Sequence, residues 1–346
     1  MQQLEMQFIG PNDPRWLSFL QQRTEANIFH HPVWMQLLQD CYGFRPFVFA
    51  ACDSGGLIHA GLPVMEVNRP LQKRRWISLP FSDHSMPLAS EPEAVTRLFY
   101  FVQSLSEKPK SPSIEIRWNI SGQVVQQTPA KYVLHMLHME PGLEKVNSLI
   151  HHSHQRNVRI AQEQGVQIRH GTEPRDLKAF YALHLETRRR QGVPIQPEKY
   201  FYLLNDILLK QGFGFISLAY RGSQCLAGAI FLNFNHTLTY KYGASTQPGL
   251  PFRPNHLIFW EAIQWGCENG YLCLDFGRSD CSNDGLRLFK SRWGAEEIPL
   301  SYLRLPPETR PSGQEDLLFS ALQGLIRIAP SWVCKIGGEL YYRMVA

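Results

Sequence analysis

The sequence predicts an α/β fold of two similar domains, each a mixed, mainly antiparallel sheet flanked by helices, followed by a C-terminal helical segment. Three observations support this prediction. The chain has 346 residues, enough for two domains of about 150 residues each. Hydrophobic residues make up 44% of the chain, so each half can bury a core. Finally, one order of elements, β-β-β-α-β, occurs twice along the chain.

The first half contains short apolar runs separated by turn residues, and one stretch with helical spacing. Asp53-Ser-Gly-Gly56 predicts a tight turn, because glycine tolerates positive φ angles. Val95, Leu98 and Val102 recur on one face of a helix. The predicted elements are a strand over residues 45–51, a turn over 53–56, strands over 57–67 and 74–80, a helix over 91–105 and a strand over 113–118.

The second half repeats this order, and both halves carry an Ala-Gly step in the strand that follows the turn. The step is Ala60-Gly61 in the first half and Ala227-Gly228 in the second, which favours a duplication. Asn269-Gly270 is a typical end of a helix. The predicted elements are a strand over residues 213–220, a turn over 221–224, strands over 225–234 and 237–243, a helix over 255–268, and strands over 271–276 and 298–305.

Helical segments precede each predicted sheet, and proline and glycine mark the border between the two halves. The border is expected at Met139-Glu-Pro-Gly142. The predicted domains are residues 1–140, residues 141–306 and a C-terminal helical hairpin over 307–346. The helices expected before the sheets cover residues 18–20 and 32–41 in the first half, and 143–164, 174–190 and 197–211 in the second.

The C-terminal segment carries the signals of a helical hairpin. Ser312 and Glu315 form a capping box, an apolar stripe follows it, and Pro330 begins a second helical segment. The favoured interpretation is a hairpin docked on the core, and the alternative is a helix that lies on a membrane surface. The stripe consists of Leu317, Leu318, Ala321, Leu322, Leu325 and Ile326, and the basic residues at its membrane edge would be Arg327, Lys335 and Arg343.

Composition and charge argue against several other classes of protein. No stretch of about 18 or more apolar residues occurs, so we expect no membrane-spanning helix. The first residues lack the basic and apolar regions of a secretory signal, and the seven cysteines form no Cys-x-x-Cys pair. These observations predict a cytoplasmic protein, with the inner face of the membrane as a further location, and no metal site. The net charge of +5 is too mild for a dedicated DNA-binding protein.

An ordered set of short motifs carries a resemblance to a known family. The β-β-β-α-β order resembles the core of the GNAT acyltransferases, and the motifs resemble their FemAB-like branch. That branch has duplicated GNAT-type domains, includes ligases that add amino acids to peptidoglycan precursors, and has relatives that accompany exopolysaccharide and exosortase systems. The motifs are Tyr240-Lys-Tyr-Gly-Ala-Ser245, Pro254-Asn255, Leu274-Asp-Phe-Gly-Arg278 and Gly285-Leu-Arg-Leu-Phe-Lys-Ser-Arg-Trp-Gly294, with Tyr42-Gly, Leu79-Pro-Phe-Ser-Asp83, Arg156-Asn-Val-Arg159 and Thr187-Arg-Arg-Arg-Gln-Gly-Val-Pro194 as further similarity.

The resemblance implies an N-acyltransferase in which an amine of an envelope-polysaccharide or peptidoglycan precursor attacks an activated acyl or aminoacyl carbon directly. The donor would be acyl-CoA or aminoacyl-tRNA, and the acceptor an anionic small molecule or a lipid-linked precursor. The chain lacks the Gly-x-Gly signature of CoA-binding GNAT proteins and the coiled-coil arm of some ligases. The alternative is therefore a non-catalytic GNAT-fold binding or scaffold protein of an exopolysaccharide system.

Lys290 is the first candidate catalytic residue, because it lies in a Phe-Lys motif. In the FemAB-like ligases the matching lysine is thought to stabilise the negative charge that develops in acyl transfer. The other interpretation of Lys290 is a surface ion pair with Asp284 or Glu296. Asp275 is the best carboxylate for a general base, although proton transfer assisted by the substrate is an equal alternative.

The remaining candidates are expected to bind substrate in a cleft of the second domain, near its junction with the first. Asn255 is predicted to cap the helix over 255–268, where Arg253 is placed to contact an anion. Tyr240 and Tyr242 alternate with Lys241, so both should point to one side of their strand, for core packing or for substrate stacking. The other candidates are Ser245, Arg278 and Phe289, together with Arg156, Arg159, Arg188 and Arg189 as contacts to an anionic substrate.

Histidines cluster before the second sheet, in His151-His-Ser-His154 and at His135 and His138. Zinc requires ligands that converge tetrahedrally, and no cysteine or carboxylate set accompanies these histidines. We therefore expect them to lie on the surface or between the domains.

Overall fold

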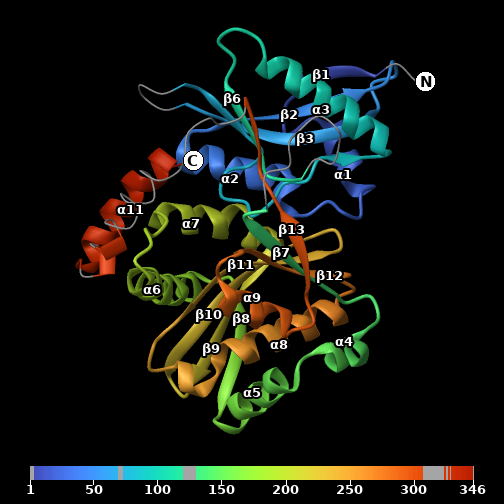
Figure 1. Ribbon diagram of the computed structural model, residues 1–346. Helices are drawn as coiled ribbons and strands as arrows, with labels where there is room; N and C mark the ends of the chain where they lie inside the picture. The colour runs from blue at the N-terminus through green and yellow to red at the C-terminus, as the bar shows by residue number, and fades with distance from the viewer. Residues whose placement is uncertain are drawn as a thin grey trace.

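The computed structural model describes residues 4–68, 73–119 and 130–306, and in the C-terminal region residues 323–324, 326–327 and 329–345. Within these residues the chain forms two separate seven-stranded sheets, one in each half, with helices packed against both (Figure 1). The predicted fold class, two mixed sheets flanked by helices, is confirmed.

The first sheet is antiparallel except where β4 pairs with β6. Trp16 and Leu38, from α1 and α2, belong to the core on one face of the sheet, whereas Leu98 and Val102 of α3 belong to the core on the other face. The strands, in sheet order, are β1 (Glu5–Ile9), β2 (Arg45–Cys52), β3 (Ile58–Val67), β4 (Arg75–Ile77), β6 (Ser113–Ile116) and β14 (Leu303–Leu305), with β5 (Leu88–Ala89) beside β3, and the helices are α1 (Pro14–Gln21), α2 (Pro32–Tyr42) and α3 (Pro92–Ser106).

The second sheet is also antiparallel except for one parallel pair, β11 with β12. Helices α4, α5 and α8 share a core with one face, and α6 and α7 share a core with the other. The strands, in sheet order, are β13 (Glu296–Leu300), β7 (Tyr132–His138), β12 (Cys273–Asp280), β11 (Thr237–Ser245), β10 (Gln224–Phe234), β9 (Gly214–Arg221) and β8 (Val166–Gly171), and the helices are α4 (Leu143–Leu149), α5 (His152–Glu163), α6 (Pro174–Gln191), α7 (Glu198–Ile207), α8 (Pro254–Glu268) and α9 (Asp284–Ser291).

Several predicted elements differ in extent from the observed ones. The strand expected over 298–305 is two strands, β13 and β14, which belong to different sheets. The helix expected over 143–164 is split into α4 and α5, because Ile150 is extended and the side chain of His151 accepts a hydrogen bond from the backbone of Ser153 and so starts a new helix. Strands β1, β7 and β8 were not expected from the sequence.

Strand β7 precedes the predicted domain border at residue 140, yet it lies inside the second sheet between β13 and β12. The two halves therefore share segments of chain, and the domain limits at 140 and 306 stay predictions. The halves also share one hydrophobic core, in which α2 packs against α7. Asn235 of the second half reinforces this junction, since its side-chain amide donates to the carbonyl oxygens of Leu20 and Arg23 at 2.9 and 3.1 Å.

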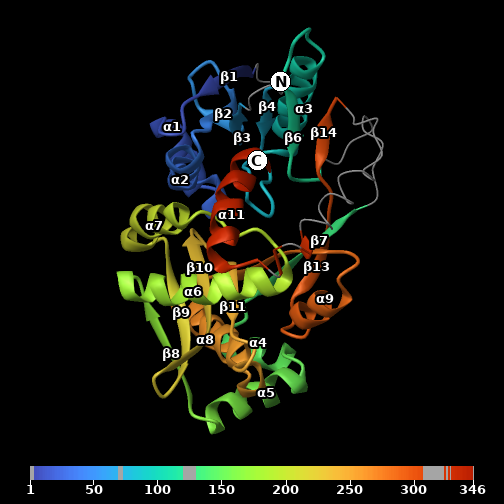
Figure 2. The same cartoon turned by 90° about the vertical axis from the view of Figure 1, so that its left-hand side faces the viewer.

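Helix α11 (Ser331–Val345) lies along both halves of the molecule (Figure 2). Arg188 donates to the hydroxyl of Tyr342 at 3.0 Å, and the ring of Tyr342 lies 5.3 Å from that of Phe81. Trp332 and Ile336 of the same helix are 65% and 54% exposed. The second helix of the predicted hairpin is thus present, whereas the capping box and most of the apolar stripe lie outside the described residues. None of the described helices is long and apolar enough to cross a membrane.

Candidate active site

The two parallel strands of the second sheet separate near the junction of the halves. Strands β11 and β12 pair only from Thr237 with Cys273 to Thr239 with Asp275, although both strands continue beyond these pairs. This is the divergence that the resemblance to GNAT proteins implies. Beyond it, Gly277 adopts a φ of +72°, which side chains rarely tolerate, and a Cβ there would lie 2.6 Å from a carboxylate oxygen of Asp83. The glycine therefore lets a loop of the first half approach β12.

Three cations surround the carboxylate of Asp83 at this junction. Lys241 comes from β11, Arg278 from β12 and Lys290 from α9. Arg278 Nε lies 3.8 Å from Asp83 Oδ1. Burial opposes the ionisation of Asp83, but the positive charges of these three residues prevail and lower its pKa. The junction is therefore a half-buried site with an excess of positive charge.

Lys290 is almost fully buried, with 4% of its surface exposed. Its ammonium group donates to the carbonyl oxygens of Gly277 and Arg278 at 2.9 and 3.0 Å, which leaves one N–H for another acceptor. Burial lowers the pKa of Lys290 to about 8. The alternative of a surface ion pair is wrong, because Asp284 pairs with Arg287 and Glu296 with His138.

The other two cations are held by backbone and aromatic groups. Lys241 donates to the carbonyl oxygen of Phe81 at 2.6 Å and lies 5.0 Å from the ring of Phe29. Arg278 donates to the hydroxyl of Tyr302, which in turn donates to the backbone oxygen of Asp83 at 2.6 Å. These contacts fix both cations in place in a region from which much of the water is excluded, where their charge acts strongly on an anion.

Asp275 is fully buried and contacts two groups. One carboxylate oxygen accepts from the backbone N–H of Gly277 at 2.7 Å, and the other lies 2.9 Å from Nε2 of His84. The second ring nitrogen of His84, Nδ1, is buried and has no hydrogen-bond partner among the described residues. Asp275 is thus placed to orient the imidazole ring of His84.

The two tyrosines of β11 point to opposite faces of the sheet, which corrects the expectation that they share one. Tyr242 is paired with Ile230 and Tyr240 with Phe231, so Lys241 is the extra residue of a β-bulge. The extra residue shifts the alternation of side chains along β11, so Tyr240 and Tyr242 lie on opposite faces. Tyr240 packs against Phe259 with ring centres 4.8 Å apart, whereas the hydroxyl of Tyr242 donates to that of Tyr200 at 3.0 Å. The bulge also directs Lys241 toward the junction, where its ammonium group donates to the carbonyl oxygen of Phe81.

Asn255 does not cap α8, contrary to prediction. The helix begins at Pro254, the N-cap is Arg253 in a left-handed conformation, and no side chain caps the helix. Proline occupies the first helical position because it needs no N–H there, which moves the start one residue earlier. The backbone of Ser245 exchanges two hydrogen bonds with the hydroxyl of Thr187 on α6. Phe289 packs on α9 against His154 and Phe259, among other aromatic rings.

The four arginines predicted to contact an anion lie in two places. Arg188 and Arg189 are half-buried near the C-terminal end of α6, where Arg188 contacts Tyr342. Arg156 and Arg159 are exposed on α5. Arg188 lies near the junction, because it and Asp83 both act on the pKa of Tyr242. The role of the four arginines in binding stays a prediction.

The predicted histidine cluster is dispersed, partly on the surface and partly in the core. His151, His152 and His138 are exposed, whereas His154 and His135 are buried, which corrects the expectation of surface or interdomain positions for these two. His154 lies 2.9 Å from the carbonyl oxygen of Phe289, and His135 lies 3.1 Å from a carboxylate oxygen of Glu297. Among the described residues, no three histidine, cysteine or carboxylate side chains come together as a metal site.

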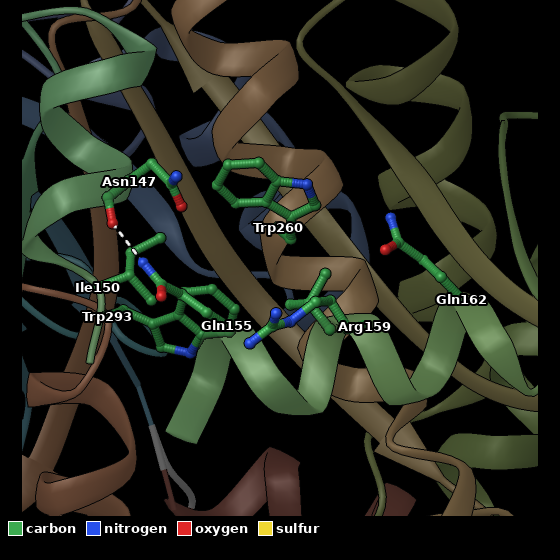
Figure 3. Close-up of a pocket in the computed structure, with 8 residues that line it drawn as sticks. Asn147, Ile150, Gln155, Arg159, Gln162, Trp260 and Trp293 are labelled. Atoms are coloured by element: carbon green, nitrogen blue, oxygen red, sulfur yellow. Dashed lines mark hydrogen bonds between the residues drawn. The ribbon is translucent and has the colours of Figure 1, made fainter. Parts of the chain in front are cut away.

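A cavity of about 300 Å³ lies beside α5 and α8 (Figure 3). Arg159 contributes to its wall, whereas Arg156 does not. Gln155 is fixed there by a hydrogen bond of 2.8 Å from its amide to the carbonyl oxygen of Asn147. The lining residues are Asn147, Ile150, Gln155, Val158, Arg159, Gln162, Trp260 and Trp293.

The sequence did not single out Asp83, His84, Lys241 and Tyr302 as site residues. The only available signal was the motif that ends at Asp83, which belongs to the family resemblance. Lys241 lies between two tyrosines that were selected, but the bulge that directs it is not visible in the alternation of the strand.

Comparison with known protein families identifies the segment that supplies most of this site. The family model of the acetyltransferase (GNAT) domain matches residues 151–290, from the start of α5 to Lys290. This segment is a GNAT domain. It contains the diverging strands β11 and β12, and with them Lys241, Asp275 and Arg278.

Local sequence similarity extends to two curated relatives. The Lipid II:glycine glycyltransferases of two Staphylococcus epidermidis strains, ATCC 35984 and ATCC 12228, are each 35% identical over 75 residues, which cover 20% of this chain and 18% of the relatives. The matched segment thus spans about a fifth of the length of these relatives.

Similarity of fold covers nearly the whole chain. The crystal structure of FemX matches with a TM-score of 0.67 at 14% identity, over 92% of this chain and 100% of FemX. L-PGS from Bacillus licheniformis matches with a TM-score of 0.55 at 14% identity over 91% of this chain and 98% of that one, and a tandem GNAT protein from the clavulanic acid biosynthesis pathway with 0.51 at 10% identity over 88% and 100%. The tandem GNAT architecture and the resemblance to the FemAB-like branch are confirmed.

Proposed function

We propose that the protein is an N-acyltransferase that transfers an acyl or aminoacyl group to an amine of an anionic cell-envelope precursor by direct attack. The observation that carries the proposal is the cluster of Lys241, Arg278 and Lys290, which lies where strands β11 and β12 diverge. Lys290 is buried, and the other two cations are half-buried. The local similarity to Lipid II:glycine glycyltransferases supports a peptidoglycan or related lipid-linked precursor as the acceptor.

The charge of the cluster favours an anionic acceptor. Three cations face two carboxylates, those of Asp83 and Asp275, and Asp275 is already engaged with His84. An excess of positive charge in a half-buried site favours the binding of a counterion. A phosphate or carboxylate of the precursor would supply that counterion, and Arg278 offers the planar fork that suits either group.

The reaction balances without a covalent enzyme intermediate. The amine nitrogen attacks the acyl carbon, a C–N bond forms, and the bond from that carbon to the donor oxygen or sulfur breaks. The remaining N–H of Lys290 is available to the oxygen on which negative charge develops. His84, held by Asp275, accepts the proton of the attacking amine and gives it to the oxygen or sulfur of the leaving group as the bond to the acyl carbon breaks.

The donor is proposed to be aminoacyl-tRNA or acyl-CoA, the two activated forms that this family of folds suggests. Both present an acyl carbon with a good leaving group, and both carry phosphates that suit a basic surface. A lipid-linked acceptor would place the protein at the inner face of the membrane, and the exposed Trp332 and Ile336 of α11 are suited to contact that surface.

Transfer is tested by incubating the protein with labelled aminoacyl-tRNA or acyl-CoA and with a panel of nucleotide-linked and lipid-linked amine acceptors. The proposal expects label on one acceptor class, dependent on Lys290. A protein that binds the precursors tightly, but transfers no label from either donor, would instead be the non-catalytic scaffold. The matched control is Lys178→Met, because Lys178 is exposed on α6.

A further inference from the structure

The cavity beside α5 and α8 combines features that are unusual in one small space. Two indole rings, from Trp260 and Trp293, form part of its wall, and three amide side chains and one guanidinium group supply the polar part. In Figure 3, Trp260 extends from α8, while Arg159 and Gln162 extend from α5 on the opposite side. A cavity of about 300 Å³ is at the small end of ligand pockets and suits a fragment rather than a large molecule.

Trp293 closes part of the cavity wall. Its side chain is fully buried, so it shapes the cavity and offers no hydrogen bond to an occupant. The hydrogen-bonding groups that can reach an occupant come from the amide side chains and from Arg159. The hydrogen bond to the Asn147 carbonyl holds the amide nitrogen of Gln155 and leaves the amide oxygen of that residue to accept from a ligand.

We propose that this cavity binds a single nucleotide. The half-buried Trp260 offers an aromatic face on which a base can stack, and stacking suits any base. Amide side chains pair with the edge of a base because they combine a donor and an acceptor. Arg159 is exposed at the cavity and carries the charge that the phosphate requires.

The nucleotide pocket is joined to the charge cluster through a short stretch of chain. The backbone N–H of Trp293 donates to the carbonyl oxygen of Lys290 at 3.1 Å. A nucleotide in the cavity would thus be separated from the segment that positions Lys290 only by the wall to which Trp293 belongs. We assign it to the nucleotide end of the activated donor, an assignment that rests on the proposed function. Adenosine nucleotide is present both in CoA and at the 3′ end of aminoacyl-tRNA.

Binding is tested by calorimetric titration of the full chain with AMP and with adenosine. Trp260→Ala should lower the affinity for AMP about tenfold or more, and Trp260→Phe should retain most of it, because a phenyl ring still stacks. Arg159→Gln should weaken AMP about three- to tenfold, the low end of a charged hydrogen bond, because Arg159 is exposed. The affinity for adenosine, which lacks the phosphate, should stay unchanged.

The matched control is Arg156→Gln, which removes the same charge from the same helix outside the cavity wall. It should leave AMP binding unchanged. An equal loss in the Arg156 and Arg159 variants, or no heat of binding at millimolar AMP, would overturn the proposal, since the first result means a diffuse electrostatic effect and the second an empty cavity.

Competition with AMP identifies the source of the nucleotide. Stronger competition by adenosine 3′,5′-bisphosphate assigns the pocket to CoA, and stronger competition by the trinucleotide CCA assigns it to tRNA. If neither compound competes with AMP, the assignment of the pocket to the donor is wrong. Lys290→Met should bind AMP like the parent protein although it loses acyl transfer, because Lys290 lies outside the cavity wall. If the parent protein itself binds AMP but transfers no acyl group, that result counts against the proposed function and not against the pocket.

Discussion

Glu115 in the first sheet and Asp275 in the second occupy the same place in their repeats. Each lies at the last position where its strand pairs in parallel with the strand before the helix, Glu115 opposite Ile77 and Asp275 opposite Thr239. Both carboxylates are buried. The repeats therefore provide two versions of one position, and their surroundings reveal how each version is used.

In the first sheet the carboxylate is enclosed by arginines. Glu115 lies 3.0 Å from Arg117, 3.5 Å from Arg75 and 3.2 Å from Arg304. Burial raises the pKa of Glu115, but these charges outweigh it and lower the pKa overall. Strand β4 ends at the last pair, so the two strands do not diverge beyond it. This position therefore joins β4, β6 and β14 through ion pairs.

In the second sheet the strands continue past the last pair and separate. Asp275 contacts His84 instead of an arginine, and the cations of the region gather around Asp83. The same position of the repeat thus holds a structural cluster of ion pairs where the strands end together, and a candidate reaction centre where the strands diverge.

The largest effect is expected when the second repeat loses its buried cation. Lys290→Met should lower kcat about 10²–10³-fold, because the charge acts on the developing oxyanion. The melting temperature should change little, since burial already disfavours the charged form of Lys290. Turnover is compared with that of the Lys178→Met control. Normal turnover in a folded Lys290→Met protein would show that Lys290 is not a catalytic residue.

A second prediction concerns pH. Burial lowers the pKa of Lys290 to about 8, so the ammonium is lost as the pH rises through 8. The rate should therefore fall about tenfold per pH unit well above that value. Because the folded state binds fewer protons than the unfolded state from about pH 8 to 10.5, the lysine's contribution to the free energy of unfolding becomes more favourable across this window. The activity should thus fall where stability rises. Lys290→Arg, which stays charged, should remove the descending limb of the pH–rate profile, and a limb that persists in this variant belongs to another group.

The smallest expected effect tests the duplication itself. Gly61 and Gly228 lie at like places, and each admits an aromatic ring from a preceding helix, Trp16 on α1 and Phe180 on α6. Gly61→Ala and Gly228→Ala should each lower the free energy of unfolding by about 1–3 kcal/mol through overpacking. Urea denaturation measures both. Little loss in either variant would mean that the matched glycines do not share this packing role.

Much of the fold was predictable because its signals are local. The spacing of Leu98 and Val102, the Asn269-Gly270 stop and the matched Ala-Gly steps each report on nearby residues. What escaped prediction depends on partners far along the chain. Strand β7 pairs with β12 and β13, and the last part of the predicted strand over 298–305 leaves the second sheet as β14 to pair with β6.

The candidate site was predictable only in part for the same reason. Lys290 and Asp275 stood in recognisable motifs, but His84 reaches Asp275 across 191 positions of sequence. The orientation of Tyr240 and Tyr242 depended on a bulge, which period-two alternation cannot reveal. The contacts that define the junction are therefore properties of the folded chain.

The most direct test compares isosteric amides at the two equivalent carboxylates. Asp275→Asn keeps the shape of the side chain but reverses its hydrogen bond with His84, so it should lower kcat about 10²-fold or more with little change in the free energy of unfolding. Glu115→Gln should lower the free energy of unfolding by about 1–3 kcal/mol, because it removes the negative charge that pairs with partly exposed arginines. The value of kcat per folded molecule should be unchanged. Equal effects of the two variants on turnover, or loss of turnover in Glu115→Gln alone, would contradict the division of roles between the two repeats.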